Sequence, residues 1–224
     1  MKKNFVGNKV LYFVILVVIF KELAFSALPL ETDDIGIIQP NNFELETGYE
    51  RTLNKDENEQ VLTIGLKTGL SQKLDFLVSV PYIISPEQEE KFEDASIGLK
   101  YLLLENLLSF SFSNSLGSNA YSLRFIFTKE FNSISLHLNL GYDVSEEKSV
   151  SGEKLVAAAV EYNISKFDLV AEVLSDGSTL KNYLVGIRYK FLGNHFICAG
   201  FKHFLKNGSQ NDSYNFVIGI HNEF

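Results

Sequence analysis

The sequence has 224 residues, a net charge of −8, 46% apolar residues and one cysteine. A single cysteine cannot form an intramolecular disulfide, which excludes a small disulfide-stapled scaffold. The acidic balance lacks the basic footprint that phosphate recognition needs, and it argues against nucleic acid as a partner. The length allows one large all-β domain or two small domains.

Residues 1–26 have the pattern of a secretory signal peptide. Three lysines accompany the wholly apolar run LYFVILVVIF, and the small residues Ala24 and Ser26 follow it. The run is shorter than the ~20 residues that span a bilayer as a helix, so a signal peptide is favoured over a membrane anchor. Cleavage near Ser26/Ala27 removes four Lys and one Glu, which leaves 16 basic and 27 acidic residues, a net charge of −11.

From residue 42 onward, apolar and polar residues alternate with a period of two. In NFELETGYER, Phe43, Leu45 and Tyr49 lie on one face, whereas Glu44 and Glu46 lie on the other. Such alternation predicts a strand between two different environments. Twelve strands are predicted, over residues 42–51, 62–70, 74–82, 95–104, 107–117, 121–127, 134–142, 156–162, 167–173, 183–189, 195–204 and 214–224.

Two architectures compete for these strands, a soluble β-sandwich and a transmembrane β-barrel. The predicted strands approach the ~9–11 residues that a tilted membrane strand needs, longer than the usual ~5–6 of soluble proteins. Tyrosines stand at strand ends, at Tyr49, Tyr82 and Tyr142 among others, as in the aromatic girdles of membrane barrels. Both features favour the barrel.

The links between the strands alternate in length. Short links are expected at 71–73, 105–106, 131–133, 163–166 and 190–194, and longer polar links at 52–60, 83–94, 143–153, 174–181 and 205–213; only 118–120 breaks the alternation. Outer-membrane barrels have short periplasmic turns and longer outer loops. The sequence therefore predicts an all-β antiparallel transmembrane β-barrel of about 12 strands over residues 42–224, in the bacterial outer membrane and in contact with its lipid.

The final stretch, FVIGIHNEF, explains why the chain stops on an aromatic residue. A closed barrel has no edge, so its last strand must pair with its first. On one face of this strand we expect a signal for the barrel-assembly machinery, formed by Phe216, Ile218, Ile220 and Phe224.

Residues 27–41 are the part that lacks a strand pattern. DDIGIIQPNN contains Asp33, Asp34 and Pro40, which indicate an irregular, extended conformation. We expect a periplasmic N-terminal segment; a plug folded into the lumen is the alternative that the sequence leaves open.

Three stretches in the first half carry a family resemblance: LPLETDDIGIIQPNNFELETGYE (28–50), GLSQKLDFLVSVPY (69–82) and EDASIGLKYLLLE (93–105). They are similar to an outer-membrane family named for the meta-pathway of phenol degradation, whose members are labelled transporters. The matching residues are Pro29, Leu30, Thr32, Asp34, Gly36, Pro40, Phe43–Glu46, Asp94, Gly98, Lys100 and Tyr101. The chain departs from the family at Asn41 and Asn42, where a Gly is common, and its second half offers no motif. The resemblance implies a barrel that admits a hydrophobic or aromatic compound.

The inward positions of the predicted barrel carry charges of both signs. They are Glu44, Glu46, Glu50, Lys67, Asp75, Lys100, Arg124, His137, Glu161, Asp168, Glu172 and Arg188. One interpretation is a structural network, because a charge in a narrow lumen is costly unless it is paired. The other is a selectivity constriction, in which opposed charges decide which small-molecule solute passes.

The inward glutamates do not predict a metal site by themselves. Glu44, Glu46 and Glu50 rise about 6.6 Å per two-residue step, too far for neighbouring carboxylates to share one ion without help. No metal and no cofactor are therefore predicted.

The sequence does not predict catalytic residues either. The four histidines are His137, His195, His203 and His221; Ser209 lies near His203 in sequence, but across the stretch KNGSQND. No G-x-S-x-G motif is present. The leading hypothesis is a non-enzymatic channel for the passive passage of small compounds. The alternatives are a structural or surface-interaction barrel with a filled lumen and, third, a membrane-embedded hydrolase.

Overall fold

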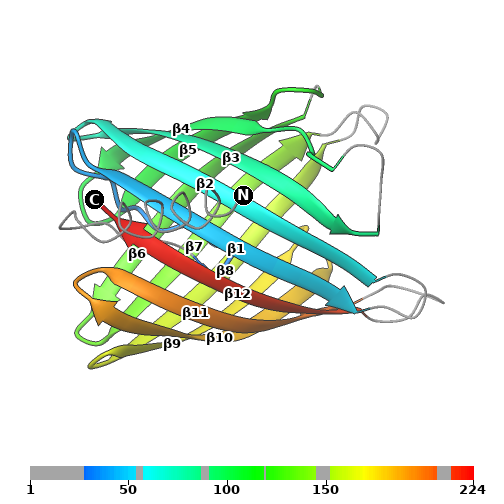
Figure 1. Ribbon diagram of the computed structural model, residues 1–224. Coiled ribbons are helices and arrows are strands. Elements are labelled where there is room, and N and C mark those ends of the chain that lie inside the picture. Colours follow the sequence, from blue (N-terminus) through cyan, green and yellow to red (C-terminus); the bar gives the residue numbers. More distant parts are fainter. Residues whose placement is uncertain (1–27, 54–57, 87–90, 119, 145–151, 206–212) are drawn as a thin grey trace, which may run out of the picture.

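The computed structural model describes residues 28–224 except 54–57, 87–90, 119, 145–151 and 206–212. The predicted signal peptide and its cleavage site lie outside the described residues. Within them, antiparallel strands form one closed barrel (Figure 1), in which each strand pairs with its sequence neighbours and β1 pairs with β12. The strands are β1 (Phe43–Leu53), β2 (Asn58–Ser71), β3 (Leu74–Ser85), β4 (Ser96–Leu104), β5 (Leu108–Ser115), β6 (Tyr121–Phe131), β7 (Ile134–Val144), β8 (Glu153–Ile164), β9 (Phe167–Ser175), β10 (Leu180–Leu192), β11 (His195–Phe204) and β12 (Ser213–Glu223). The predicted fold class is confirmed. No helix in the described residues is long and apolar enough to cross a membrane.

Several strands extend beyond the apolar alternation that predicts them. β2 begins at Asn58 rather than Leu62, and β10 begins at Leu180 rather than Tyr183. The extra residues continue the backbone ladder, as in the pairing of Asn58 with Leu53. Backbone pairing needs no apolar side chain, which is why periodicity alone misses these ends.

The turns at one end of the barrel are short, as predicted (Figure 1). Asn106, Asn132, Ser165 and Gly193 adopt positive φ angles between 53° and 59° in these turns. Asn and Gly tolerate this left-handed conformation better than other residues, so the sequence favours tight turns here.

The two faces of the wall have opposite chemistry. Apolar side chains on the outer face are open, with Ile218 58% exposed and Phe125 48% exposed, whereas the inward Lys202 is only 1% exposed. A water-soluble protein buries its apolar residues and exposes its charges. The inverted arrangement is that of a wall with lipid outside and a polar lumen inside.

The C-terminal residue closes the barrel. The backbone N–H of Phe43 donates to the carbonyl of Phe224 at 2.9 Å, and the N–H of Phe224 donates to the carbonyl of Phe43 at 2.8 Å. Their rings stack with centroids 5.1 Å apart. The chain therefore ends inside the ladder, as expected of a closed sheet.

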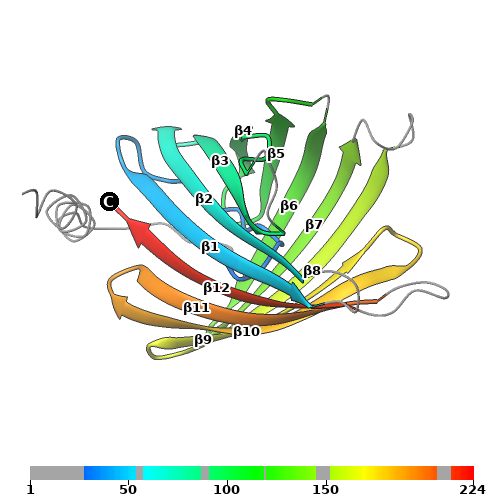
Figure 2. The ribbon, with the colours of Figure 1, turned by 45° about the vertical axis from the view of Figure 1, so that its right-hand side comes forward.

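Residues 28–42, called the lumenal segment below, lie inside the barrel (Figure 2, blue), rather than extended into the periplasm. Leu30, Thr32 and Ile38 are each at most 5% exposed. This placement corresponds to the plug alternative. The sequence left it open because the segment is held by backbone groups and single side chains, which produce no periodic pattern.

Candidate functional site in the barrel lumen

An apolar contact anchors the start of the lumenal segment. Leu30 packs into a buried cluster with the inward-facing Ala159, Val170, Leu184 and Val217. These apolar wall residues form a small core inside a lumen that is otherwise polar. Leu30 is thus held by burial of apolar surface, the non-directional part of the attachment.

Polar contacts hold the same end of the segment. The backbone N–H groups of Glu31 and Thr32 donate to one carboxylate oxygen of Glu172, at 2.9 and 2.5 Å. Arg188 Nε donates to the carbonyl of Leu28 at 2.5 Å, and Lys202 pairs with the Glu31 carboxylate. Each buried wall charge here has a partner on the segment, which offsets the cost of burying it.

Similar polar contacts hold the rest of the segment, from Asp33 to Ile38. Lys100 Nζ lies 3.0 Å from Asp33 Oδ1 and 3.6 Å from Asp34 Oδ1. The N–H of Ile38 donates to both carboxylate oxygens of Asp75, at 3.0 and 3.1 Å. Asp75 and Lys100, both predicted as lumenal candidates, therefore bind the segment rather than line an open pore.

Other predicted lumenal charges pair across the wall. Arg188 Nη1 lies 2.7 Å from Glu161 Oε2, and Lys67 Nζ lies 3.3 Å from Glu44 Oε1. Arg124 is half-buried and donates to the carbonyl of Glu31 at 3.4 Å. These pairs support the structural-network interpretation for most of the predicted set.

Sequence reasoning missed one of the most buried cations, Lys202. It lies in HFICAGFKHF, the least regular of the predicted strands, but it is two residues from Gly200 and four from Cys198. All three positions face inward by the period of two. Carrying the alternation through this strand would have placed Lys202 in the lumen.

The lumenal segment does not fill the barrel completely. A cavity of about 670 Å³ lies between the segment and the wall, at the end with the short turns. Asp34–Ile37 and Gln39 line it from the segment. The wall contributes Gln72, Leu102, Glu105, Asn106, Thr128, Glu130, Asn132, Ser133, Ser135, His137, Glu161, Asn163, Asp168 and Lys190. The lining combines apolar and polar groups, and it includes the predicted lumenal residues His137 and Glu161.

Three side chains of this lining stand in the order of a hydrolytic triad but are not arranged to act as one. Thr128 Oγ1 lies 2.9 Å from His137 Nδ1, and His137 Nε2 lies 3.6 Å from Glu161 Oε1. Thr128, however, is only 4% exposed, and its hydroxyl accepts the N–H of Ile35 at 3.2 Å. A nucleophile must reach its substrate, and the lumenal segment leaves only a small part of Thr128 open to the cavity.

The fold matches solved outer-membrane proteins, whereas no protein-family model matches the sequence and no curated protein matches it. The COG4313 outer membrane channel from Pseudomonas putida F1 aligns with a TM-score of 0.61 at 10% identity, over 87% of this chain and all of the other. The KdgM porin aligns with a TM-score of 0.57 at 13% identity, over 80% and 99%. The Escherichia coli outer membrane phospholipase A aligns at 0.51 and 10% identity, over 88% and 94%. These identities are low, so the likeness concerns the fold alone.

Proposed function

We propose that this protein is a passive channel of the bacterial outer membrane for small molecules. The cavity of about 670 Å³ beside the lumenal segment carries the proposal, because it leaves space inside a closed wall whose outer face is apolar. The expected signal peptide supports export. The structural similarity to the COG4313 outer membrane channel and to the KdgM porin supports the same class of function.

The chemistry of the cavity supports a small aromatic compound that carries a polar group. Ile35, Ile37 and Leu102 offer apolar surface, and Asn132 and Lys190 are among the polar side chains that line the same space. Ligand sites commonly combine apolar walls with a few polar groups that fix orientation. The family resemblance in the first half of the sequence points to the same class of compound.

Single-channel recording tests the proposal. The protein would be purified from the outer membrane of a Gram-negative host and checked for the mobility shift on heating that intact barrels show. In planar bilayers we expect discrete conductance steps, and we expect 4-hydroxybenzoate to reduce them as it occupies the cavity. Arg124→Gln should shift the ion selectivity towards cations, because it removes a half-buried positive charge from the lumen. Lys166→Gln, in a short turn outside the lumen, is the matched control and should not.

Silence from verified barrels would overturn the channel proposal. The lumenal segment would then act as a permanent filling, and the structural or surface-interaction alternative would be favoured. Turnover of a lipid that disappears in a His137→Gln variant would instead support the hydrolase alternative.

A further inference from the structure

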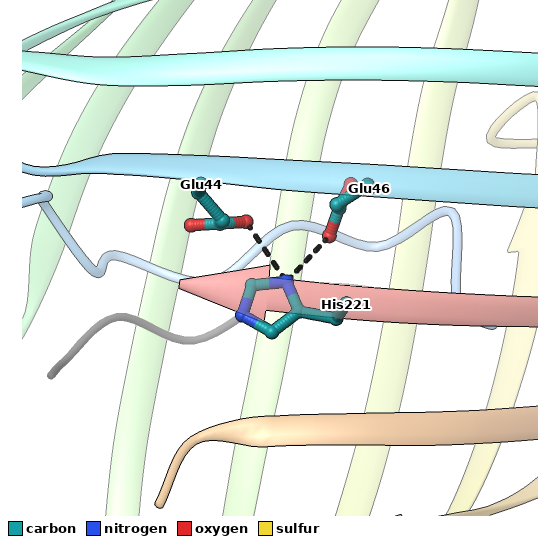
Figure 3. Close-up of side chains that lie close together, drawn as sticks. All are labelled: Glu44, Glu46 and His221. Carbon is teal, nitrogen blue, oxygen red and sulfur yellow. Dashed lines mark ion pairs between the residues drawn. The ribbon is translucent and has the colours of Figure 1, made fainter. Parts of the chain in front are cut away.

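Two glutamates and a histidine gather at the seam where β1 meets β12. Glu44 and Glu46 project from β1 into the lumen, and His221 projects from β12 towards them (Figure 3). His221 Nδ1 lies 3.4 Å from Glu44 Oε1 and 3.6 Å from Glu46 Oε1. The two carboxylates on β1 are too widely spaced along the strand to share an ion by themselves. The neighbouring strand β12 supplies a third potential ligand, His221.

These distances suit a shared metal ion. Zinc binds imidazole nitrogen and carboxylate oxygen at ~2.0–2.2 Å, so two ligand atoms at a tetrahedral centre lie roughly 3.3–3.6 Å apart. The two histidine–carboxylate distances have this length, and all three ligand atoms lie within 4.8 Å of one another. Rotation of the carboxylates would let the three atoms surround one ion.

Four polar atoms of the cluster are buried without a hydrogen-bond partner in the described part of the chain. His221 is 0% exposed, and neither of its ring nitrogens has a hydrogen-bond partner in the described part of the chain. Glu44 Oε2 and Glu46 Oε1 lack one there as well. A buried polar atom without a partner is costly and needs an explanation, and a metal ion would satisfy several of these atoms at once.

The histidine ring is held in position by its surroundings. It stacks on Phe196 with centroids 4.6 Å apart and an angle of 17° between the planes. In this orientation Nδ1 points between the two carboxylates (Figure 3). A ring fixed in advance loses little freedom when it binds an ion, which favours binding.

One nearby cation competes for the site. Lys67 Nζ lies 3.3 Å from Glu44 Oε1 and neutralises one of the two carboxylates. With both carboxylates ionised and a neutral imidazole, as in a metal-bound cluster, the four side chains carry a net charge of −1, so a divalent cation is electrostatically favoured. Glu46 keeps 19% of its side chain exposed to the lumen, which gives an ion a path inward.

We propose that Glu44, Glu46 and His221 bind a divalent first-row transition metal ion, with zinc as the representative. Imidazole nitrogen with carboxylate oxygens is a ligand set for such metals rather than for Ca²⁺ or Mg²⁺. The ion would tie the first strand of the barrel to the last. This site is independent of the proposed channel function.

Metal titration of the whole protein tests the site. The barrel would be purified without a polyhistidine tag, stripped with a chelator and titrated with Co²⁺. We expect one equivalent to bind with the visible absorption of tetrahedral Co²⁺, and Zn²⁺ to displace it. Zn²⁺ should also raise the temperature at which the compact gel form is lost, because a ligand that binds only the folded state stabilises it.

Variants with a matched control locate the ion. His221→Gln and Glu46→Gln should each weaken Co²⁺ binding at least about tenfold, because changing even an outer-shell partner of a metal ligand typically costs ~10–100-fold in affinity. His137→Gln should leave it unchanged, because His137 faces Glu161, which Arg188 already binds at 2.7 Å. Lys67→Gln should tighten binding, because it removes the competing ammonium from Glu44.

The outcomes separate a metal site from a plain ion-pair cluster. If wild-type protein binds no stoichiometric Co²⁺ or Zn²⁺, the proposal is wrong, and it is equally wrong if His221→Gln and Glu46→Gln bind as the wild type does. The heating shift on gels verifies that each variant is folded. Should His221→Gln fail to fold, Glu46→Gln decides, since Gln keeps the shape of the partly exposed Glu46.

Discussion

Individual charged residues in this barrel act as attachment points rather than as free lumenal charges. Lys202 is 1% exposed and pairs with Glu31, and Asp75, also 1% exposed, accepts the N–H of Ile38. Burying a charge is tolerable only with such partners. The inner face of the wall is therefore complementary to one particular segment of its own chain.

Gly69 allows a close approach between the wall and the lumenal segment, which leads to a prediction at this residue. A Cβ at position 69 would overlap the carbonyl oxygens of Ile38 and Gln39. Gly69→Ala should therefore push this part of the segment off the wall and weaken the bond from the Ile38 N–H to Asp75. We expect the amide of Ile38 to exchange with deuterium on the order of tenfold faster, as measured by mass spectrometry of peptides from residues 28–42.

Gly65→Ala is the matched control on the same strand. A Cβ there would contact only the Glu46 Cβ, at an ordinary 3.8 Å. Exchange at Ile38 should stay at the wild-type rate in this variant. Equal exchange in the two variants would mean that the close approach at Gly69 does not position the segment.

At the scale of elements, the lumenal segment combines one apolar anchor with a series of polar bonds. Leu30 is the anchor, and we expect Leu30→Ala to cost about 2 kcal/mol or more of segment attachment, as for a buried leucine elsewhere. Deuterium exchange at Glu31 and Thr32 should accelerate at least tenfold while the strands stay protected. Leu136→Ala, on the open outer face at 44% exposure, is the control. If deuterium exchange in the strands rises together with exchange in the lumenal segment, the Leu30→Ala variant has lost the barrel rather than the attachment of the segment.

The strands were predictable from the sequence because their side-chain period is local. Strands over 134–142 and 167–173 needed only alternation, and they were found nearly at their observed bounds. The position of residues 28–42 was not predictable, since the Glu172 carboxylate that binds Thr32 lies 140 residues away in sequence.

The cluster of Glu44, Glu46 and His221 was unpredictable for a related reason. Its residues meet only because the β1–β12 register places Glu46 opposite His221. The sequence predicts that the first strand pairs with the last, but not the register in which they pair. Which lumenal charges face one another across strands is therefore information that only the folded barrel contains.

At the scale of the whole molecule, stability depends on closing the sheet between β1 and β12. The register runs from Glu44 opposite Glu223 to Leu53 opposite Tyr214. Phe43 and Phe224 extend it by two reciprocal backbone bonds and a stacked ring pair. Without this seam both strands would expose unpaired backbone groups to lipid, where each unsatisfied group costs several kcal/mol.

Phe224→Ala tests the seam directly. Phe224 is 8% exposed, and its replacement removes the ring contact with Phe43 and the apolar cover over the last backbone bonds. We expect a smaller folded fraction in the outer membrane and a lower temperature for loss of the compact gel form. Phe131→Ala, on the outer face at 53% exposure, should change neither.

The outcomes distinguish a role in stability from a role in assembly. If both variants reach the same folded fraction but only the Phe224→Ala protein accumulates before it inserts into the membrane, Phe224 acts in assembly, as the sequence predicts. If Phe224→Ala matches wild type in both measurements, the backbone ladder alone closes the barrel and the terminal ring is dispensable.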